Sequence, residues 1–302
     1  CMGFGLREGG YGQRQDEGQM LRGKVHVGGL KATQLDGLGV VAERFAPLYE
    51  GHVTTRENFR FHHIKLEDTA AAMRAIGEVG LSTREACGNT VRNVTGCPMA
   101  GVCAEEPFDV TPYAAAYSRY FVRHPFTPAM PRKFKTAFSG CHQDCAITAI
   151  HDMGFIPRIV DGKRGFKVLT GGGTSIMARI APTLYEFVPV EEYLKVTEAV
   201  IRIFHRSNEL RKNRMKARIK FLIDRIGMDE FRTQVEEELK GDWANKKIDL
   251  KSLMELEDEE RDDPPSAPGS PDAYVNGNGP AEFLEWKRAN VEEQRQEGYN
   301  LV

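Results

Sequence analysis

The sequence of 302 residues lacks a long hydrophobic run and lacks an excess of charge of either sign. No apolar stretch approaches the roughly 20 residues that a membrane-spanning helix needs, and no apolar signal region follows a basic start. The 41 basic residues nearly balance the 43 acidic residues, which gives a formal net charge of -2. This balance offers no global reason to expect nucleic acid or an anionic membrane as a partner. We therefore expect a cytoplasmic protein in which any functional positive charge is local.

Cysteine is the most informative residue type that is present. Five of the six cysteines fall between positions 87 and 145, and the full set is Cys1, Cys87, Cys97, Cys103, Cys141 and Cys145. In a chain of this size and expected compartment, clustered thiols indicate a metal site rather than a disulfide framework. Cys87 stands outside the paired spacing of the others and is interpreted as structural.

Four of these cysteines form two pairs. Cys97 and Cys103 form a CxxxxxC pair in GCPMAGVC, and Cys141 and Cys145 form a CxxxC pair in SGCHQDC. Four thiolates suit a 4Fe-4S cluster, whose irons each take one soft ligand, whereas zinc usually prefers more closely spaced ligands. The alternative is that these residues are small buried apolar side chains or remnants of a lost site.

Hydrophobic patterns predict an α+β fold that begins with a β-α-β-α segment. Residues 24–30 alternate like a short strand, 35–49 have helical spacing, 52–66 alternate again, and 67–81 are typical of a helix. This order is typical of a ferredoxin-like layer, so we assign residues 1–82 to a ferredoxin-like half-domain.

The remaining sequence predicts a second α+β domain at 83–250. Prolines break residues 85–150 into loops that carry the cysteines, and a strand at 165–175 runs into three glycines. Helices are expected at 190–206, 211–226 and 228–240.

A composition change marks the end of this domain. Residues 251–280 turn acidic and then rich in Pro, Gly, Ser and Asn, which predicts a flexible linker. Residues 281–302 regain helix-forming character and end on a strand-like Tyr-Asn-Leu-Val. We interpret them as the start of a truncated second repeat.

Basic residues precede both cysteine pairs in the sequence. Arg56 lies in a predicted strand, and Arg92 shortly precedes the first cysteine pair. Lys133 and Lys135 precede the second pair, and alternation along a strand would point both ammonium groups into one pocket. A reductase that acts on a small oxyanion needs fixed positive charge to bind the anion and to donate protons as its oxygens leave as water. For each of these residues taken alone, a solvated surface position is the alternative.

Four sequence segments resemble the first repeat of the sirohaem-dependent sulfite and nitrite reductases. In chain order they are HVTTRENFRFH, ACGNTVRNVTGCPMAG, MPRKFKTAFSGC and VLTGGGTS. The resemblance covers residues 3–240, and the final segment resembles the opening of a second repeat. In that family a duplicated fold cradles sirohaem, an iron tetrapyrrole with many carboxylates, bridged through a cysteine sulfur to a 4Fe-4S cluster. The resemblance implies six-electron reduction of sulfite to sulfide or nitrite to ammonia, with electrons from ferredoxin or a flavoprotein.

The resemblance also implies roles for individual residues. The substrate-anion ligands of the family match Arg56, Arg92, Lys133 and Lys135. Close approach of the backbone to the macrocycle would be allowed by Gly171, Gly172 and Gly173. We expect the basic residues Arg214, Arg218 and Lys220 to lie on one helix. There they would either face sirohaem carboxylates or be solvated.

One departure from the family pattern bears on function. Many members carry the cluster cysteines in the second repeat, whereas this first repeat has a complete set in Cys97, Cys103, Cys141 and Cys145. Either these residues bind the active cluster, as in a dissimilatory or anaerobic relative, or they are vestigial. In the second case the chain is a non-catalytic half that supplies the substrate-anion wall to another repeat. We expect the chain by itself to be inactive.

The identity of Phe134 and Lys135 bears on the substrate. Lys133-Phe134-Lys135 resembles the sulfite reductases more than the plant-type nitrite reductases, which favours sulfite.

Overall fold

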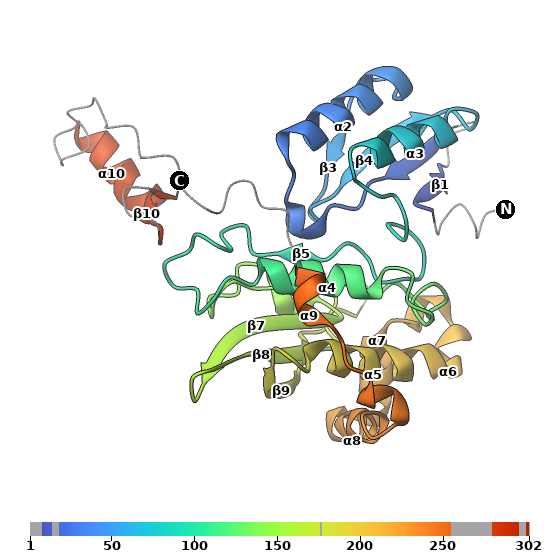
Figure 1. The fold of residues 1–302 in the computed structure, drawn as a ribbon, viewed down its shortest axis with the longest axis vertical. Helices are drawn as coiled ribbons and strands as arrows, with labels where there is room; N and C mark the ends of the chain where they lie inside the picture. Colours follow the sequence, from blue (N-terminus) through green and yellow to red (C-terminus); the bar gives the residue numbers. More distant parts are fainter. Residues whose placement is uncertain (1–7, 14–17, 176, 255–279, 296–299, 302) are drawn as a thin grey trace.

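The structure is a computed structural model that describes residues 8–13, 18–175, 177–254, 280–295 and 300–301. Its main body consists of two layered units of helices and strands, and the smaller unit, blue in Figure 1, is built from the N-terminal residues. The α+β fold expected from the sequence is confirmed. None of the described helices is long and apolar enough to cross a membrane.

The N-terminal unit is a four-stranded antiparallel sheet with the order β1-β2-β4-β3, packed against two helices. Its elements are β1 (Gly10–Gly12), β2 (Gln19–Arg22), the 3-10 turn η1 (His26–Gly28), α2 (Ala32–Phe45), β3 (His52–Val53), β4 (Phe59–Ile64) and α3 (Thr69–Glu78). One hydrophobic cluster joins Leu21 of β2 and Phe61 of β4 to Leu38 of α2 and Ile76 of α3. Burial of these apolar faces holds both helices on the sheet.

The helices of this unit follow the sequence pattern. The predicted helices at 35–49 and 67–81 are confirmed as α2 and α3. The α2 helix ends before Pro47, because a proline cannot donate the backbone hydrogen bond that would continue it.

The predicted strand at 24–30 is wrong, because this segment holds the turn η1 instead. Val27 and Gly28 both adopt positive φ, at 46° and 72°, which is incompatible with an extended strand. The strand that pairs with β4 lies just upstream, as β2.

The predicted strand at 52–66 is split into β3 and β4 by a tight turn. The Glu57 N–H donates to the Thr54 carbonyl at 2.9 Å, and the Thr54 hydroxyl donates to Asn58 Oδ1 at 2.6 Å. Arg56 therefore lies in a turn rather than in a strand.

The larger unit is built on a five-stranded mixed sheet with the order β5-β6-β7-β8-β9. Its strands are β5 (Thr95–Gly96), β6 (Thr136–Phe138), β7 (Met153–Val160), β8 (Lys163–Thr170) and β9 (Thr183–Pro189). The first three strands run parallel, and β8 and β9 continue the sheet in antiparallel pairs. Asp161 and Gly162 join β7 to β8 with positive φ at both residues, as a type I′ hairpin requires.

Helices cover this sheet around an aromatic core. They and the short turns are α4 (Thr111–Phe121), η2 (Thr148–Ile150), α5 (Tyr193–Arg206), α6 (Asn208–Arg211), η3 (Arg214–Lys216), α7 (Ile219–Ile226), α8 (Met228–Glu238), η4 (Asp242–Asn245) and α9 (Leu250–Met254). Phe138 of β6 stacks on Phe155 of β7 at 4.5 Å, and Tyr117 of α4 and Tyr193 of α5 meet both rings edge-on. This packing anchors the sheet from which the cysteine-bearing loops leave.

Three elements of the larger unit match their predictions. The strand at 165–175 is confirmed as β8, although it ends at Thr170, and the helices at 190–206 and 228–240 are confirmed as α5 and α8. The strand stops there because Gly171 has a φ of 90°.

The predicted helix at 211–226 is wrong, because the segment is broken into α6, η3 and α7. The Asn213 backbone is extended, and its side chain accepts a hydrogen bond from the Met215 N–H at 3.0 Å. The backbone is extended again at Arg218, just before α7 begins. Arg214, Arg218 and Lys220 therefore do not lie on one helix.

The last described segment docks on the loop that follows β5. Residues 255–279 of the predicted linker lie outside the described residues, and 251–254 belong to α9 instead. Beyond the linker lie α10 (Ala281–Asn290) and an antiparallel pair, β10 (Glu292–Glu293) and β11 (Asn300–Leu301). The Arg295 N–H donates to the Val102 carbonyl at 2.7 Å. The interpretation of 281–302 as the start of a second repeat stays a prediction.

Candidate functional site

A basic cavity of about 910 Å³ opens between the N-terminal sheet and the loops of the larger unit. All four predicted anion ligands line it, although they come from separate segments of the chain. Its cationic lining residues are Arg22, Arg56, Arg60, Arg92, Arg132, Lys133, Lys135, Arg211 and Arg214. Within the described part of the chain, no acidic side chain lines the cavity. Such a concentration of uncompensated positive charge favours an anionic ligand.

Arg56 reaches from the β3-β4 turn into the larger unit. Its Nη1 lies 2.6 Å from His151 Nε2 and donates to Thr95 Oγ1 at 3.3 Å. Its Nη2 donates to the carbonyls of Asn93 and Thr136. Burial lowers the pKa of Arg56 to about 10, so the guanidinium stays charged at neutral pH. Its buried Nε–H has no acceptor among the described residues, which leaves one donor for a ligand.

His151 can accept the hydrogen bond from Arg56 because its ring is neutral. Burial, followed by the charge of Arg56, lowers the pKa of His151 to about 3. Its Nδ1 lies 2.9 Å from the Ile147 carbonyl, which can only accept, so Nδ1 carries the proton and Nε2 is the acceptor. A neutral imidazole thus orients the Arg56 guanidinium.

Lys133 and Lys135 flank Phe134 in the segment that leads into β6. Phe134 is fully buried, whereas both lysines are half-buried and line the cavity, as the predicted alternation requires. Neither ammonium group has a hydrogen-bond or ion-pair partner in the described part of the chain. Burial, followed by repulsion from neighbouring cations, lowers the pKa of each lysine to about 8. An ammonium group of this kind attracts an anion and also gives up a proton readily.

Arg92 precedes β5 and bends back over its own loop. Its Nε donates to the Gly88 carbonyl at 2.9 Å, and its Nη1 donates to the Ala86 carbonyl at 3.3 Å. Burial lowers the pKa of Arg92 to about 10, which leaves it charged at neutral pH. Arg22 and Arg60 lie opposite each other in the register of β2 and β4, so the N-terminal sheet adds two more guanidinium groups to the cavity wall.

A buried ion pair braces the lysine segment. Arg218 donates two hydrogen bonds of 2.7 Å to Asp152, and Asp152 Oδ2 also accepts the Lys135 backbone N–H at 2.7 Å. Lys220 is buried and donates to the Met177 carbonyl at 2.8 Å. Arg218 and Lys220 thus contact groups of their own chain. Their contact with sirohaem stays a prediction.

The three glycines after β8 are explained by packing within the protein. A Cβ on Gly171, whose φ is 90°, would approach an Ile223 side-chain carbon at 2.6 Å. A Cβ on Gly172 would lie 2.3 Å from the Ala149 carbonyl oxygen, which leaves no room for a side chain. Approach of a macrocycle to these glycines stays a prediction.

The four thiols predicted as cluster ligands converge in the loops that follow β5 and β6. Cys97, Cys103 and Cys141 are buried, and Cys145 is exposed. Burial raises the pKa of Cys97, Cys141 and Cys145, and in each case other thiols of the set raise it further. Every thiol of the set is therefore close to the others, and binding to iron would relieve the repulsion between their thiolates.

The spacing of the sulfurs suits a cluster better than a single ion. Zinc at 2.3 Å from each of four sulfurs would place the sulfurs ~3.8 Å apart. Among the described residues, no three of the four sulfurs all lie within 4.8 Å of one another. A cube of irons and sulfides is larger than one ion and takes more widely spaced thiolates. These residues therefore fit a 4Fe-4S cluster.

The basic residues and the cysteines occupy opposite ends of the same strands. Arg92 precedes β5 and Cys97 follows it, while Lys135 precedes β6 and Cys141 follows it. Extended backbone advances about 3.3 Å per residue, so the five steps from Arg92 to Cys97 span up to ~16 Å. Among the described cysteines only Cys87 lines the basic cavity. The basic residues and the cysteines are therefore apart in the structure, although they are near one another in the sequence.

Sequence reasoning missed part of the cavity wall and the groups that support it. The missed cations are Arg22, Arg60, Arg132 and Arg211. Arg132 adjoins Lys133, so the basic run PRKFK carries a signal for it. The supports His151 and Asp152 carry no local signal, because only the folded chain brings them to Arg56 and Lys135.

Comparisons with known protein families match both units. Residues 11–79 match the model described as nitrite/sulfite reductase ferredoxin-like half domain, and residues 87–242 match the model described as nitrite and sulphite reductase 4Fe-4S domain.

Curated relatives point the same way. The chain is 34% identical over 225 residues to a ferredoxin-nitrite reductase of Leptolyngbya laminosa, which covers 73% of this chain and 44% of that protein. It is 35% identical over 220 residues to sulfite reductase (ferredoxin) 2 of Mycolicibacterium paratuberculosis, which covers 72% of this chain and 39% of that protein. The chain therefore spans less than half the length of these relatives.

Solved structures share the fold. The Mycobacterium tuberculosis NirA protein has a TM-score of 0.71 at 32% identity, over 77% of this chain and 45% of that one. A structure of dissimilatory sulfite reductase I has a TM-score of 0.62 over 90% of this chain and 78% of that one. Its sequence identity is 12%, so this second likeness concerns the fold alone.

Proposed function

Since the chain belongs to the sirohaem-dependent nitrite and sulfite reductase family, we propose that it binds sulfite or nitrite for six-electron reduction at sirohaem. The observation that carries this proposal is the single cavity lined by nine cationic side chains and, among the described residues, by no acidic one. The anion would bind at Arg56, Arg92, Lys133 and Lys135, which share this cavity.

The lysines would hold the anion and supply protons. Their ammonium groups have no partner among the described residues, so each can donate a charge-assisted hydrogen bond to an oxyanion. With a pKa of about 8, each is mostly protonated at neutral pH and releases its proton more easily than an exposed lysine. Reduction of either anion consumes protons as oxygens leave as water, which general acids at this position would provide.

The remaining cations would hold the cofactor. Sirohaem coupled to a 4Fe-4S cluster supplies the electrons when it is bound. Guanidinium groups bind carboxylates in a forked geometry, so the tetrapyrrole carboxylates would face Arg22, Arg60, Arg132, Arg211 and Arg214. Among the four cysteines, Cys145 is exposed and is our candidate for the thiolate that would face a second sirohaem, outside this cavity.

The separation of the two sets suggests how a complete centre is assembled. Because β5 and β6 lie between the basic cavity and the cysteines, one bridged cofactor would not contact both within this chain. We propose that the cavity faces a cluster carried by another repeat or by a second copy of the chain. The chain then supplies the substrate-anion wall, and its own cysteines hold a cluster that serves a second centre.

Ferredoxin is the proposed electron donor. It is named in the descriptions of the nitrite and sulfite reductases to which the chain is similar. A flavoprotein is the alternative donor for this family, as the sequence resemblance implies.

The proposal is tested by anion binding to the sirohaem-containing protein that carries this chain. Nitrite and sulfite are titrated and the visible absorption of sirohaem is followed. Lys133→Ala or Lys135→Ala should each weaken binding by ~10- to 150-fold, the equivalent of about 1.5–3 kcal/mol for a charge-assisted contact. Sirohaem content should be unchanged. Lys163→Ala, at an exposed position on β8, is the control and should bind as the wild type does. Wild-type affinity in both test variants would refute the assignment of the cavity.

A further inference from the structure

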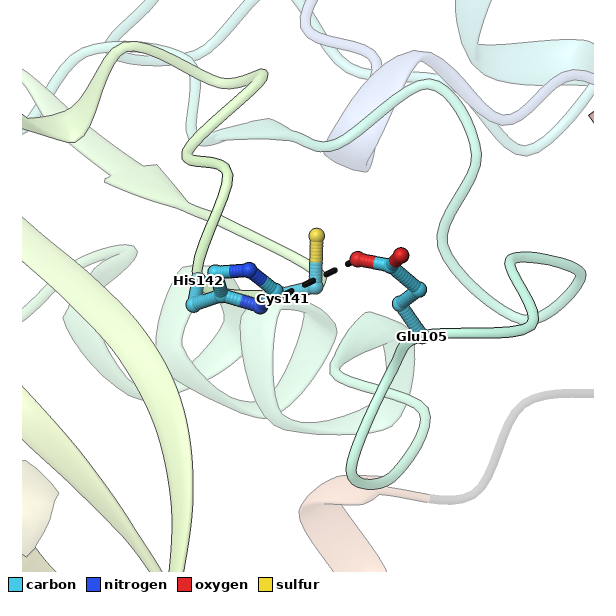
Figure 2. Close-up of side chains that lie close together, drawn as sticks. All are labelled: Glu105, Cys141 and His142. Carbon is cyan, nitrogen blue, oxygen red and sulfur yellow. Dashed lines mark ion pairs between the residues drawn. The ribbon is translucent and has the colours of Figure 1, made fainter.

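Three side chains with different ligand atoms converge beside the cysteine cluster. They are Glu105, from the loop after β5, and Cys141 and His142, from the loop after β6, as Figure 2 shows. The three ligand atoms all lie within 4.8 Å of one another. His142 Nδ1 lies 3.9 Å from Glu105 Oε2, along the dashed line in Figure 2.

We propose that Glu105, Cys141 and His142 form a binding site for one divalent transition-metal ion, with Zn²⁺ as its representative. A thiolate, an imidazole and a carboxylate are the three ligand types that zinc takes in proteins. Three protein ligands are also the usual number where water occupies the fourth position. This site does not depend on the proposed reductase activity.

The distances require only small movements of exposed side chains. Ligand atoms at about 2.0–2.3 Å from a tetrahedral ion lie ~3.3–3.8 Å apart, so the present arrangement must contract by ~1 Å. The His142 side chain is 81% exposed and the Glu105 side chain is 52% exposed, so both can rotate toward the buried Cys141 thiol. The same exposure leaves room for water as the fourth ligand.

A neighbouring amide orients the carboxylate. Gln143 Nε2 donates a hydrogen bond of 2.9 Å to Glu105 Oε2. Hydrogen bonds of this kind from outside the ligand set hold metal-binding carboxylates in a fixed direction. The loop Cys141-His142-Gln143 therefore supplies two ligands and the support of the third.

This site and the iron-sulfur cluster are mutually exclusive, because both need the Cys141 sulfur. Cys97 and Cys145 belong to the cluster set but not to the group of three. Binding of the ion deprotonates the Cys141 thiol and forms the metal-sulfur bond, with release of one proton and no change of oxidation state. Zn²⁺ bound before the cluster forms should therefore delay cluster assembly.

The site is tested on the metal-free full chain under anaerobic conditions. Co²⁺ serves as the probe, because its bond to a thiolate produces a charge-transfer absorption, and Zn²⁺ is then titrated in competition. We expect one ion per chain. His142→Ala and Glu105→Gln should each weaken binding by at least ~10-fold. Glu191→Gln, at another exposed carboxylate, is the matched control and should leave the affinity unchanged.

Substitutions of cluster cysteines outside the group of three distinguish this site from a site made of cysteines alone. Cys97→Ser and Cys145→Ser should lose the cluster on reconstitution but keep Co²⁺ binding, whereas His142→Ala should bind Co²⁺ more weakly but still form the cluster. Zn²⁺ should slow cluster formation in the wild type and not in His142→Ala. Co²⁺ affinity that survives both His142→Ala and Glu105→Gln, or that is lost in Cys97→Ser, would overturn the proposal. Circular dichroism of each variant verifies its fold.

Discussion

The carboxylate of Asp152 binds the guanidinium of Arg218 through two hydrogen bonds of 2.7 Å, and both residues are buried. The same carboxylate accepts the backbone N–H of Lys135, so one ion pair links the start of α7 to the lysine segment of the basic cavity. Neither partner lines the cavity, which makes Asp152 and Arg218 positioning residues.

The first prediction concerns this ion pair. Asp152→Asn keeps the shape of the side chain but leaves the Arg218 guanidinium buried without a counter-charge. We expect the free energy of unfolding to fall by ~3–5 kcal/mol, as for other broken buried pairs. Urea unfolding measures the change. Asp229→Asn, which breaks the exposed pair with Arg232, is the control and should leave stability nearly unchanged. Equal stability in both variants would contradict the role of the buried pair.

The second prediction is a pH dependence of anion binding. Lys133 and Lys135 have pKa values of about 8, so both lose their charge as the pH rises through that value. The Kd for nitrite, whose charge does not change in this range, should be constant below pH 7. Well above pH 8 it should rise by up to ~10-fold per pH unit for each lysine.

A substitution and a stability measurement check this assignment. Lys135→Arg keeps a charge at high pH and should remove one of the two lysine contributions to the slope. The pKa of each lysine is lowered on folding, so the unfolded chain binds more protons above pH 8, and stability should rise there while anion affinity falls. A Kd that is flat to pH 10 would show that the lysines do not bind the anion.

The third prediction concerns the cluster. Replacement of any one thiol by Ser should remove iron and acid-labile sulfide together, because each thiolate ligates one iron of the cube. The variants are Cys97→Ser, Cys103→Ser, Cys141→Ser and Cys145→Ser. Cys87→Ser is the control, since Cys87 lines the basic cavity and does not belong to the set. Iron content that is unchanged in all four variants would support vestigial cysteines.

The fourth prediction tests the contact between Arg56 and His151. His151→Ala removes the acceptor at 2.6 Å from Arg56 Nη1, and an unsatisfied buried donor costs ~1–3 kcal/mol of stability. His151→Gln retains an acceptor and should recover part of the loss. The pKa of His151 is lowered to about 3, so nitrite affinity should show no histidine titration between pH 5 and 7. Such a titration in the wild type, absent from His151→Gln, would contradict a neutral imidazole.

Local patterns in the sequence were enough for several elements and residue sets. The helices α2, α5 and α8 follow the spacing of apolar residues, because one face of each must be buried. The alternation around Phe134 predicted that Lys133 and Lys135 point the same way, because side chains along extended backbone alternate between two sides. The two cysteine pairs were recognisable from spacing alone.

Long-range contacts decided the segments where local patterns failed. Residues 24–30 alternate like a strand, but Val27 packs against Gly96, where a Cβ would lie 2.9 Å from its side chain, and the Val27 N–H donates to the Val94 carbonyl. These contacts hold Val27 in a positive-φ turn that no alternation pattern reveals.

By itself the sequence determined which residues are candidates for the site, and the tertiary structure decided which of them meet. Arg92 and Cys97 are close in the chain, yet β5 places them at opposite ends of a strand, because an extended backbone separates residues along its length. Parallel pairing of β5 with β6 then gathers the basic residues at the N-terminal ends of these strands and the cysteines at their C-terminal ends. The cavity wall also needs Arg22 and Arg60, which only the packing of the N-terminal sheet against the larger unit brings there.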